Sequence, residues 1–337
     1  MASDRRPKIS IIIPNLNGEH LLGACLASLK RQSYQDFELV LVDNASQDNS
    51  LGLVASEYPL AAICRLSENQ GFSRAVNKGF ALARGAYIFL LNNDTELDPD
   101  CLKNLNDFLD ERPDLSFAAA KMLFFDDRQI INNAGDTLSI YGLAHQRGKG
   151  ELDRGQYQKA EPIFSACAGG AMYRRELLER LNGFAENFWA YLEDVDLGFR
   201  AQLLGRRGYL VPRAVIYHLD GGTSKKTKNL VNFLTIRNSL YLVYRNYPLS
   251  LLVLLAPCLL VSQARNIMSG LKHHYLPEVF RAYRDFIRAL PELSRERRAI
   301  QKSRVISSYQ VFKLLSKKYP FSFKRNLYGL LHHHRQL

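Results

Sequence analysis

Short apolar runs and helical patterns alternate along the first hundred residues. Four runs rich in Ile, Val and Leu predict buried strands at 8–14, 37–43, 61–66 and 86–91. The segments between them carry apolar residues at helical spacing and predict helices at 20–32, 47–58 and 72–85. Strands that alternate with helices through short connections are typical of a parallel sheet covered on both faces. We therefore predict an α/β fold for this part of the chain.

The alternation becomes less regular after residue 98. The pattern predicts an amphipathic helix at 99–113 that Pro99 opens, with Asp98 as its cap. Further along, it predicts a strand at 115–125, polar loops and hairpins at 126–165, a strand and helix at 168–184 that Gly183 ends, and an acidic start that leads into an amphipathic helix at 191–208.

Each of the first four predicted strands is followed by a group of residues that contains Asn or Asp. The groups are Pro14, Asn15 and Asn17; Asp43, Asn44 and Ser46; Asn69, Gly71 and Phe72; and Asn92, Asn93 and Asp94. In open parallel sheets ligands bind beyond the carboxyl ends of the strands. Four polar strand ends on one edge therefore predict a polar ligand. The chain has neither GxGxxG after its first strand nor GxxxxGK[ST], so dinucleotide and P-loop phosphate binding are poorly supported.

Charge divides the chain into two parts. Residues 231–337 hold 18 Lys and Arg against 4 Asp and Glu, a net charge of +14, whereas residues 1–230 hold 27 against 29, a net charge of −2. We expect two parts with different partners: a near-neutral domain at 1–230 and a basic helical region at 231–337.

The basic region contains an apolar stretch at 249–261. Its 13 residues are fewer than the ~20 that a transmembrane helix needs, so a buried helix or a segment lying in the membrane plane fits better. The residues that follow interleave Arg and Lys with Phe, Tyr, Leu and Ile, which is typical of amphipathic helices on an anionic membrane surface. Nucleic acid is the electrostatic alternative, but no recognition motif accompanies the charge, and we predict none.

The cysteines and the N-terminus bear on localisation. Five scattered cysteines without a CxxC pair favour a reducing cytosol and argue against a disulfide framework or a zinc site. The first ten residues lead into a strand without a signal-peptide apolar region. We expect a cytoplasmic protein, peripheral on the inner face of the cytoplasmic membrane.

Four segments together carry a resemblance to a known family. They are "SIIIPNLNGEHLLGACLASLKRQSYQDFELVLVDNASQDNS", "ENQGFSRAVNKGFALARGAYIFLLNNDTEL", "AGGAMYRRELLERLNGFAENFWAYLEDVDLGFRAQLLG" and "AVIYHLDGGTS". In this order, over residues 8–224, they resemble the nucleotide-sugar-dependent family 2 glycosyltransferases of the GT-A fold. The resemblance implies a Rossmann-like, mostly parallel sheet between helices. It also implies a nucleotide-binding half at 1–98 and an acceptor and catalytic half at 99–230, followed by the basic helical extension.

The resemblance implies a divalent metal, Mg²⁺ or Mn²⁺, held by Asp94, which closes a DXD-type motif. A cation bound to carboxylate oxygen can neutralise the charge that develops on a departing nucleotide diphosphate. The chain has Asn92 where many relatives carry Asp, and this removes one carboxylate from the site. His218 matches a position that supplies a second metal ligand in some relatives, although a histidine at a strand end is equally consistent with a structural role.

Inverting transfer requires a carboxylate that removes a proton from the acceptor hydroxyl. The "EDVD" cluster supplies Glu193, Asp194 and Asp196, and crowding of the three favours a raised pKa for one of them. Matching the family motif favours Asp194 as the base, Glu193 as a residue that orients the acceptor, and Asp196 as structural. Acids that complement a helix dipole are the alternative interpretation. Trp189 and Tyr191 either stack on an acceptor sugar or pack in the core.

The remaining strand ends are expected to bind the nucleotide sugar. By resemblance Asp43 reads the base or ribose, and Arg74 is a candidate contact to the diphosphate. The full predicted set is Pro14, Asn15, Asn17, Asp43, Asn44, Asn69, Gly71, Phe72, Arg74, Asn92 and Asn93. The Gly-rich, basic segment at 221–228 is either a lid that closes on phosphates or an ordinary solvated loop.

The expected function is transfer of a sugar from a nucleotide-diphosphate donor to a saccharide acceptor carried on a lipid. The "NND" and "YLEDVDL" versions of the motifs resemble bacterial enzymes of surface polysaccharide synthesis, such as O-antigen, capsule or cell-wall synthesis, and include rhamnosyltransferases. L-rhamnose from a dTDP donor is the first expectation for the sugar, with UDP-sugars next. The alternatives are a catalytically inactive nucleotide-sugar-binding module and a nucleotidyltransferase of similar architecture.

Overall fold

The computed structural model describes residues 6–220 and 228–318. The chain begins with β1 (Ile9–Asn15), α1 (Glu19–Lys30), β2 (Phe37–Asp43), α2 (Ser50–Glu57), β3 (Ala62–Arg65), α3 (Phe72–Leu82), β4 (Tyr87–Leu91), β5 (Thr95–Leu97) and α4 (Cys101–Asp110). It continues with β6 (Leu115–Phe124), β7 (Ile131–Asn133), β8 (Asp136–Leu138), β9 (Ala144–Gln146), β10 (Glu161–Ile163), β11 (Gly170–Arg174), α5 (Arg175–Leu181), the 3₁₀ helix η1 (Glu186–Phe188), α6 (Glu193–Leu203) and β12 (Arg207–His218). The final described helices are α7 (Lys228–Asn246), α8 (Leu249–Leu254), α9 (Ala256–Lys272), α10 (Leu276–Ser303) and α11 (Ser308–Leu314).

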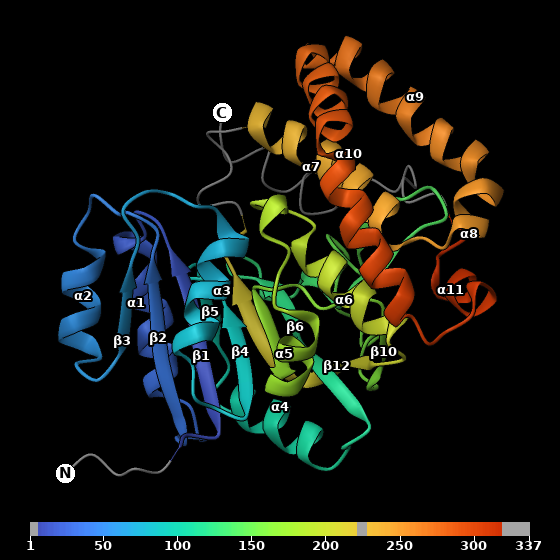
Figure 1. Cartoon of the computed structure of the whole chain (residues 1–337). Coiled ribbons are helices and arrows are strands. Elements are labelled where there is room, and N and C mark those ends of the chain that lie inside the picture. The colour runs from blue at the N-terminus through green and yellow to red at the C-terminus, as the bar shows by residue number, and fades with distance from the viewer. Residues whose placement is uncertain (1–5, 221–227, 319–337) are drawn as a thin grey trace.

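A mixed, mostly parallel sheet forms the centre of the molecule (Figure 1). Its strands lie in the order β10-β12-β6-β11-β4-β1-β2-β3, with β5 paired to β12 and β7 paired to β6. The strands β4, β1, β2 and β3 run parallel, as predicted, and β11 runs antiparallel between β4 and β6. The carboxyl ends of β1, β2 and β4 therefore lie at one edge of the sheet.

Helices cover both faces of this sheet. Residues of α1, α2 and α4 pack on one face, and residues of α3, α5 and α6 pack on the other. All five residues of β4 are buried because apolar side chains cover the strand from both sides. The α/β prediction is confirmed, and the strand predicted at 37–43 has the same bounds in the structure.

Two predictions about helices are wrong in detail. Helix α4 begins at Cys101 after Asp100, and the side chain of Asp98 accepts a hydrogen bond from the Asp100 backbone at 3.3 Å and does not cap the helix. Helix α6 is not amphipathic: from Val195 to Leu203 every residue is buried. Its charged residues lie inside the molecule because α7 and α10 pack against its outer side.

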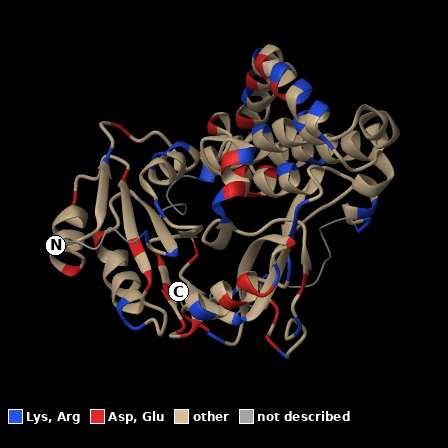
Figure 2. Ribbon diagram, turned by 60° about the horizontal axis from the view of Figure 1, so that its bottom comes forward, with Lys and Arg blue, Asp and Glu red and all other residues tan. Residues whose placement is uncertain are grey.

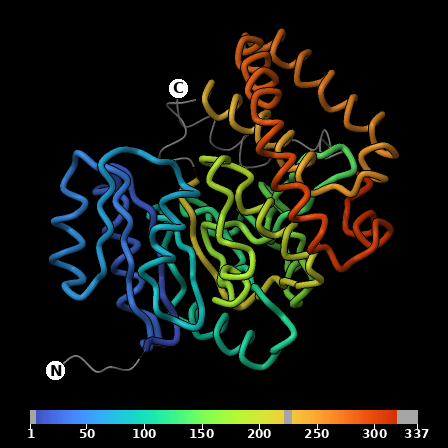
Figure 3. Tube along the Cα trace, viewed as in Figure 1, coloured from blue at the N-terminus to red at the C-terminus, as the bar shows by residue number. Residues whose placement is uncertain are grey.

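The C-terminal helices lie to one side of the sheet, shown from orange to red in Figure 3. Helix α7 contacts α6 and η1, and a shared apolar cluster joins α6 to α7, α8, α10 and α11. Among the described residues no helix is both long enough and apolar enough to span a membrane. The apolar stretch at 249–261 forms α8 and the start of α9, in which Leu251 and Leu255 are buried and most other apolar side chains are exposed.

Candidate active site

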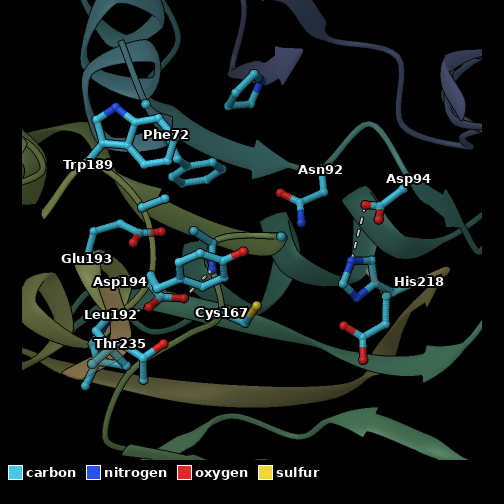
Figure 4. Close-up of a pocket in the computed structure, with 18 of the residues that line it drawn as sticks. Phe72, Asn92, Asp94, Cys167, Trp189, Leu192, Glu193, Asp194, His218 and Thr235 are labelled. Carbon is cyan, nitrogen blue, oxygen red and sulfur yellow. Dashed lines mark hydrogen bonds and ion pairs between the residues drawn. The ribbon is translucent and has the colours of Figure 1, made fainter. Parts of the chain in front are cut away.

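A cavity of about 740 Å³ opens where the carboxyl ends of β1 and β4 face the start of α6. Its wall contains most of the side chains predicted from the sequence: Pro14, Asn15, Asn44, Asn69, Gly71, Phe72, Asn92, Asn93, Asp94, Trp189, Tyr191, Glu193, Asp194 and His218. Figure 4 shows Asp94 and His218 at one side of the cavity and Glu193 and Asp194 at the other. The sheet thus brings together residues that are far apart in the sequence.

Three predicted residues lie outside the cavity wall. Asn17 faces the loop after β2, where its Oδ1 accepts a hydrogen bond from the Gln47 backbone at 2.7 Å. Asp43 is completely buried and accepts a hydrogen bond from the backbone N–H of Ser46 at 3.2 Å. Arg74 is paired at the surface with Glu186 at 2.8 Å. These side chains surround the cavity and do not line it. The segment predicted as a lid, 221–228, lies outside the described residues except for Lys228.

Neutral amide side chains connect the loops on the sheet side of the cavity. The Nδ2 of Asn93 donates to Oδ1 of Asn15 at 2.7 Å, and the Nδ2 of Asn15 donates to the Ser46 hydroxyl at 3.2 Å. The Nδ2 of Asn44 donates to the carbonyl oxygen of Gly71 at 3.3 Å. These bonds tie the ends of β1, β2 and β4 to each other. The result is an uncharged rim whose amides can both donate and accept hydrogen bonds.

Gly71 allows the loop before α3 to approach Trp189. Its φ of +82° lies in the left-handed region, and a Cβ at this position would lie 2.6 Å from the indole ring and from the carbonyl oxygen of Trp189. The same carbonyl accepts a hydrogen bond from the Ser73 backbone at 3.1 Å. A glycine is therefore required here for both conformation and space.

Asp94 and His218 face each other across a strand pair. The antiparallel pairing of β5 with β12 places His218 opposite Thr95, so His218 Nε2 lies 3.2 Å from Asp94 Oδ1. The other ring nitrogen, Nδ1, lies 3.1 Å from Oδ1 of Asn132. When Nδ1 carries the proton and donates it to this amide oxygen, Nε2 is left as an acceptor directed at the Asp94 side. Metal-binding histidines are commonly held in this way.

The residues at this point fit a divalent cation that a diphosphate also binds. The carboxylate of Asp94 and Nε2 of His218 are directed toward the same part of the cavity wall. Within the described residues no group of three or more His, Cys, Asp and Glu could hold a metal by itself. Two protein ligands leave coordination positions for phosphate oxygens and water, as in Mg²⁺ sites that bind nucleotides. An imidazole beside a carboxylate favours Mn²⁺ over Mg²⁺.

Glu193 and Asp194 begin α6 on the opposite side. The Oδ2 of Asp194 accepts a hydrogen bond from the Ala168 backbone at 3.1 Å, and its Oδ1 accepts one from Val195 at 2.8 Å. Burial raises the pKa of Asp194 despite these bonds. Burial, followed by the charge of Asp194, raises the pKa of Glu193 well above its usual value. The Oε2 of Glu193 is buried and has no hydrogen-bond partner among the described residues.

The turn that precedes these acids is held in an unusual backbone conformation. Trp189, Tyr191 and Leu192 have φ values of 66°, 70° and 65°. Such left-handed values are uncommon for residues with large side chains and persist only where surrounding bonds fix them. The Nδ2 of Asn238 on α7 supplies such bonds, because it donates to the carbonyl oxygens of Phe188, Ala190 and Tyr191 at 2.9, 2.8 and 2.7 Å.

Asp196 has the structural role that was predicted for it. It is completely buried, accepts a hydrogen bond from Arg200 Nε at 2.7 Å, and lies 3.7 Å from Arg245 Nη1. Asn246 Nδ2 donates to its other oxygen at 2.8 Å. The charge of Arg245, followed by that of Arg200, lowers the pKa of Asp196 in spite of its burial. Three neighbouring acids thus have two different functions: Asp196 fixes α6 to α7, and Glu193 and Asp194 face the cavity.

Several residues of the cavity wall were not predicted from the sequence. Asp136 is the first residue of the hairpin strand β8, and burial together with the charge of Asp194 raises its pKa to about 8. Lys149 and Asp220 form an ion pair of 2.8 Å within the wall, beside His218. The wall also contains Cys167, whose pKa is raised by burial. These residues lie in the irregular region or just after β12, where no period in the sequence indicates which side chains point inward.

Comparison with protein families identifies residues 10–181 with the model for "Glycosyl transferase family 2", which covers half of the chain. The "O-antigen biosynthesis protein RfbC" of Myxococcus xanthus is 28% identical over 229 residues, 65% of this chain and 18% of that protein. A "PGL/p-HBAD biosynthesis glycosyltransferase" of Mycobacterium bovis is 39% identical over 109 residues, 31% of this chain and 43% of that protein. The chain therefore spans less than half the length of these curated relatives.

Solved structures share the fold. Residues 1–349 of Staphylococcus aureus TarS superimpose with a TM-score of 0.57 at 18% identity, over 98% of this chain and 91% of that chain. The mannosyltransferase PcManGT from Pyrobaculum calidifontis, in complex with GDP-Man and Mn²⁺, gives a TM-score of 0.53 at 18% identity, over 89% of this chain and 86% of that chain. At these identities the likeness concerns the fold alone, and it confirms the predicted GT-A fold with a helical C-terminal region.

Proposed function

The chain belongs to glycosyl transferase family 2, and from this premise we propose that it transfers a sugar from a nucleotide-diphosphate donor to a saccharide acceptor. One observation carries the proposal: a single cavity joins an uncharged amide rim, the Asp94–His218 pair and a carboxylate pair at Glu193 and Asp194. The amide rim and the Asp94–His218 pair suit the binding of a nucleotide sugar. The carboxylates suit the activation of an acceptor hydroxyl.

We assign the donor to the sheet side of the cavity. The amides of the rim can bind the nucleotide and the sugar hydroxyls, and Phe72 and Gly71 line the same wall. Asp94 and His218 would hold a divalent cation, which would neutralise charge on the departing diphosphate. Lys149 lies in the same wall, where it is paired with Asp220, and would be a further contact for the phosphates if it exchanged that partner. By resemblance dTDP-rhamnose is our first choice of donor, with UDP-sugars next.

We assign the proton transfer to Asp194. The acceptor hydroxyl attacks the anomeric carbon while its proton passes to the carboxylate of Asp194, and the bond from that carbon to the diphosphate oxygen breaks. The nucleoside diphosphate leaves with the bonding electrons, and the configuration at the anomeric carbon is inverted. A carboxylate of raised pKa is a better proton acceptor at neutral pH than an ordinary aspartate. Glu193 orients the acceptor, and Trp189 and Tyr191 stack against it from the strained turn.

The proposed acceptor is a saccharide on a membrane lipid, in the synthesis of a cell-surface polysaccharide. The names of the O-antigen and PGL/p-HBAD relatives support this class of pathway. The basic C-terminal helices support attachment to an anionic membrane surface, and Figure 2 shows Lys and Arg gathered on them. We keep the division into a catalytic domain at 1–230 and a membrane-associating region at 231–337, with one qualification. Thr235 of α7 lines the cavity, so the second region contributes to the site of the first.

A thermal-shift screen of nucleotide sugars tests the assignment. Ligands that bind only the folded state raise its melting temperature, so the true donor class should raise it, and should do so more strongly with Mn²⁺ than without metal. The Asp94→Asn protein should lose the metal-dependent part of the shift. If no dTDP-, UDP- or GDP-sugar shifts the melting temperature with or without metal, the proposed function is wrong.

A further inference from the structure

Helix α9 exposes an apolar stripe on its outer side. The exposed positions are Pro257, Leu260, Val261, Ala264, Met268 and Leu271, which recur at helical spacing over about 21 Å of helix. No charged residue interrupts this stripe before Lys272 at its end. A surface helix of a water-soluble protein carries polar residues on its outer face, so α9 has the opposite arrangement. Helix α8 extends the apolar surface with Leu249, Val253 and Leu254, each at least 63% exposed.

An apolar cavity of about 300 Å³ lies beneath this stripe, between α7, α9 and α10. Its wall contains Val243 and Leu240 of α7, Ala256, Leu259 and Leu260 of α9, and Phe286 of α10. Leu260 belongs both to the wall and to the exposed stripe, so the cavity and the apolar surface are continuous. A volume of this size is at the lower end of the range of ~300–1,000 Å³ that is typical of ligand cavities.

The polar groups of this cavity wall are bonded within the protein. The Ser239 hydroxyl donates to the carbonyl oxygen of Ile236 in its own helix at 2.8 Å, and the Tyr244 hydroxyl pairs with Ser294 at 2.8 Å. Gln263, which also lines the wall with Tyr141, donates from Nε2 to the Ser262 hydroxyl at 3.1 Å, and the rest of the wall presents mostly hydrocarbon. The chemistry therefore selects an apolar chain over a polar metabolite.

Two elements connect this cavity to the active site. Helix α7 contributes Thr235 to the active-site wall and Ser239 to the apolar wall, and one turn of helix, about 6 Å, separates the two positions. The β8–β9 hairpin contributes Gly142 to the apolar wall and Ala144 to the active site. Gly142 has a φ of +72°, and a Cβ there would lie 2.6 Å from Val243. The hairpin thus packs closely against α7 at the boundary between the two cavities.

The charges of α9 and α10 indicate the kind of surface that these two helices bind. Residues 256–303 hold nine Lys and Arg against four Asp and Glu, a net charge of +5. On α10 the exposed apolar residues Phe280 and Ile287 lie among the exposed Arg281, Arg284 and Arg288. Apolar surface flanked by cations is the pattern that anionic bilayers bind, because acyl chains bury the apolar residues while phosphates neutralise the cations.

We propose that α8 and α9 enter the acyl region of an anionic bilayer and that the cavity beneath them binds the hydrocarbon chain of the lipid that carries the acceptor saccharide. The assignment of this hydrocarbon chain to the acceptor lipid rests on the proposed function. The binding of a hydrocarbon chain in the cavity and the contact with the bilayer are independent of it.

Binding of cis-parinaric acid, a fluorescent fatty acid, to the full chain tests the cavity. The wild-type protein should show saturable binding, and Ala256→Phe, which fills the cavity, should weaken it by about tenfold because the apolar contacts of the chain are lost. Ala264→Phe adds the same ring on the exposed face of the same helix and should bind as the wild type does. Absence of saturable binding to the wild type, or unchanged binding to Ala256→Phe, would overturn the proposal.

Flotation with vesicles of phosphatidylcholine and phosphatidylglycerol tests the stripe. The double variant Val261→Glu/Met268→Glu should lower the bound fraction about tenfold, because two exposed apolar side chains become charged. Leu60→Glu is the matched control, since Leu60 is 99% exposed and lies between α2 and β3. Equal flotation of the double variant would show that the stripe is not the membrane contact. A dimer in solution that the same double variant dissociates, without vesicle binding, would instead assign the stripe to self-association.

Transfer assays separate this proposal from the proposed function. If Ala256→Phe reduces transfer to a lipid-linked acceptor but leaves transfer to a soluble saccharide intact, the hydrocarbon site and the proposed function are both supported. If the protein binds cis-parinaric acid and vesicles but transfers no sugar to any acceptor, the proposed function fails and the hydrocarbon site remains. If transfer proceeds equally with both acceptors in Ala256→Phe, the assignment of the acceptor chain to this cavity is wrong.

Discussion

The two sides of the active-site cavity differ in charge and in how their side chains are held. On the sheet side, neutral amides at the ends of β1, β2 and β4 hold each other in place, and their loops follow directly from the strands. On the α6 side, the buried Glu193 and Asp136 and the half-buried Asp194 are acids with raised pKa values, and a strained turn precedes Glu193 and Asp194. The first arrangement suits binding, which needs fixed donors and acceptors. The second suits proton transfer, which needs a carboxylate kept from bulk water.

The largest effect should come from Asp194→Asn. Removing the proposed base while keeping the shape of the side chain should lower kcat by about 10²–10⁴-fold, the usual contribution of general base catalysis. Donor affinity should change little, because the nucleotide sugar is assigned to the opposite side. Steady-state transfer rates and calorimetric titration with the donor measure the two quantities. Asp114→Asn, an exposed aspartate at the surface, is the control and should behave as the wild type does. A variant that keeps its kcat would remove the functional distinction between the two sides.

The Asp94→Asn change should affect the sheet side. Loss of the carboxylate beside His218 should weaken donor binding in the presence of Mn²⁺ by about 10–100-fold, and the dependence of binding on Mn²⁺ should disappear. Donor titrations with and without Mn²⁺ measure this effect. His218→Asn should give the same direction of change. Retention of full metal dependence in both variants would mean that the cation is held elsewhere.

The strained turn predicts a change in stability together with a change in rate. Asn238→Ala removes three hydrogen bonds to the carbonyl oxygens of residues 188, 190 and 191, and should lower the free energy of unfolding by about 1–3 kcal/mol. Because the turn positions Glu193 and Asp194, kcat should fall while donor affinity is preserved. Urea unfolding measures the loss of stability, steady-state transfer rates measure kcat, and donor titration measures donor affinity. Asn104→Ala, which removes a single surface hydrogen bond to Arg213, is the matched control. Equal destabilisation by both variants would show that α7 does not hold the turn.

The raised pKa of Asp136 predicts a smaller, pH-dependent effect. Its pKa is about 8 in the folded protein, above the ordinary value of 3.8, so the folded state holds a proton that the unfolded state has lost between these values. This contribution to stability is fully present below about pH 4 and is lost as pH rises to about 8. Asp136→Asn should therefore lose less stability between pH 5 and 8 than the wild type. If the stability of the wild type and of Asp136→Asn changed in parallel with pH, the raised pKa of Asp136 would be contradicted.

The sheet side could be predicted from the sequence more fully than the α6 side. Its residues directly follow apolar runs whose period is clear, so their position at one edge follows from the parallel sheet. The pattern places a residue at the edge of the sheet, but it does not fix the direction in which the side chain points. Asn17 follows β1 and Asp43 ends β2 at this edge, but their side chains bond to the loop after β2 and do not line the cavity.

The α6 side depends on contacts between distant segments. Asn238 lies within an ordinary helical pattern, and only the packing of α7 against the turn shows what its amide does. Asp136 and Lys149 lie in short irregular strands and loops that carry no period. The charges of α6 suggested an exposed face, but Asp196 and Arg200 pair inside the molecule because α7 covers the helix. A pattern of polarity cannot distinguish an exposed charge from a buried ion pair.

The configuration of the transferred sugar tests the central claim most directly. Direct attack by an acceptor hydroxyl that Asp194 deprotonates must invert the anomeric carbon of the donor. Proton NMR of the product, formed from a donor of known configuration and followed from the first turnovers, measures this outcome. We predict a product of inverted configuration from the wild type, formed at a rate that Asp194→Asn reduces. A product of retained configuration would contradict the assignment of Asp194 as the base of a single displacement.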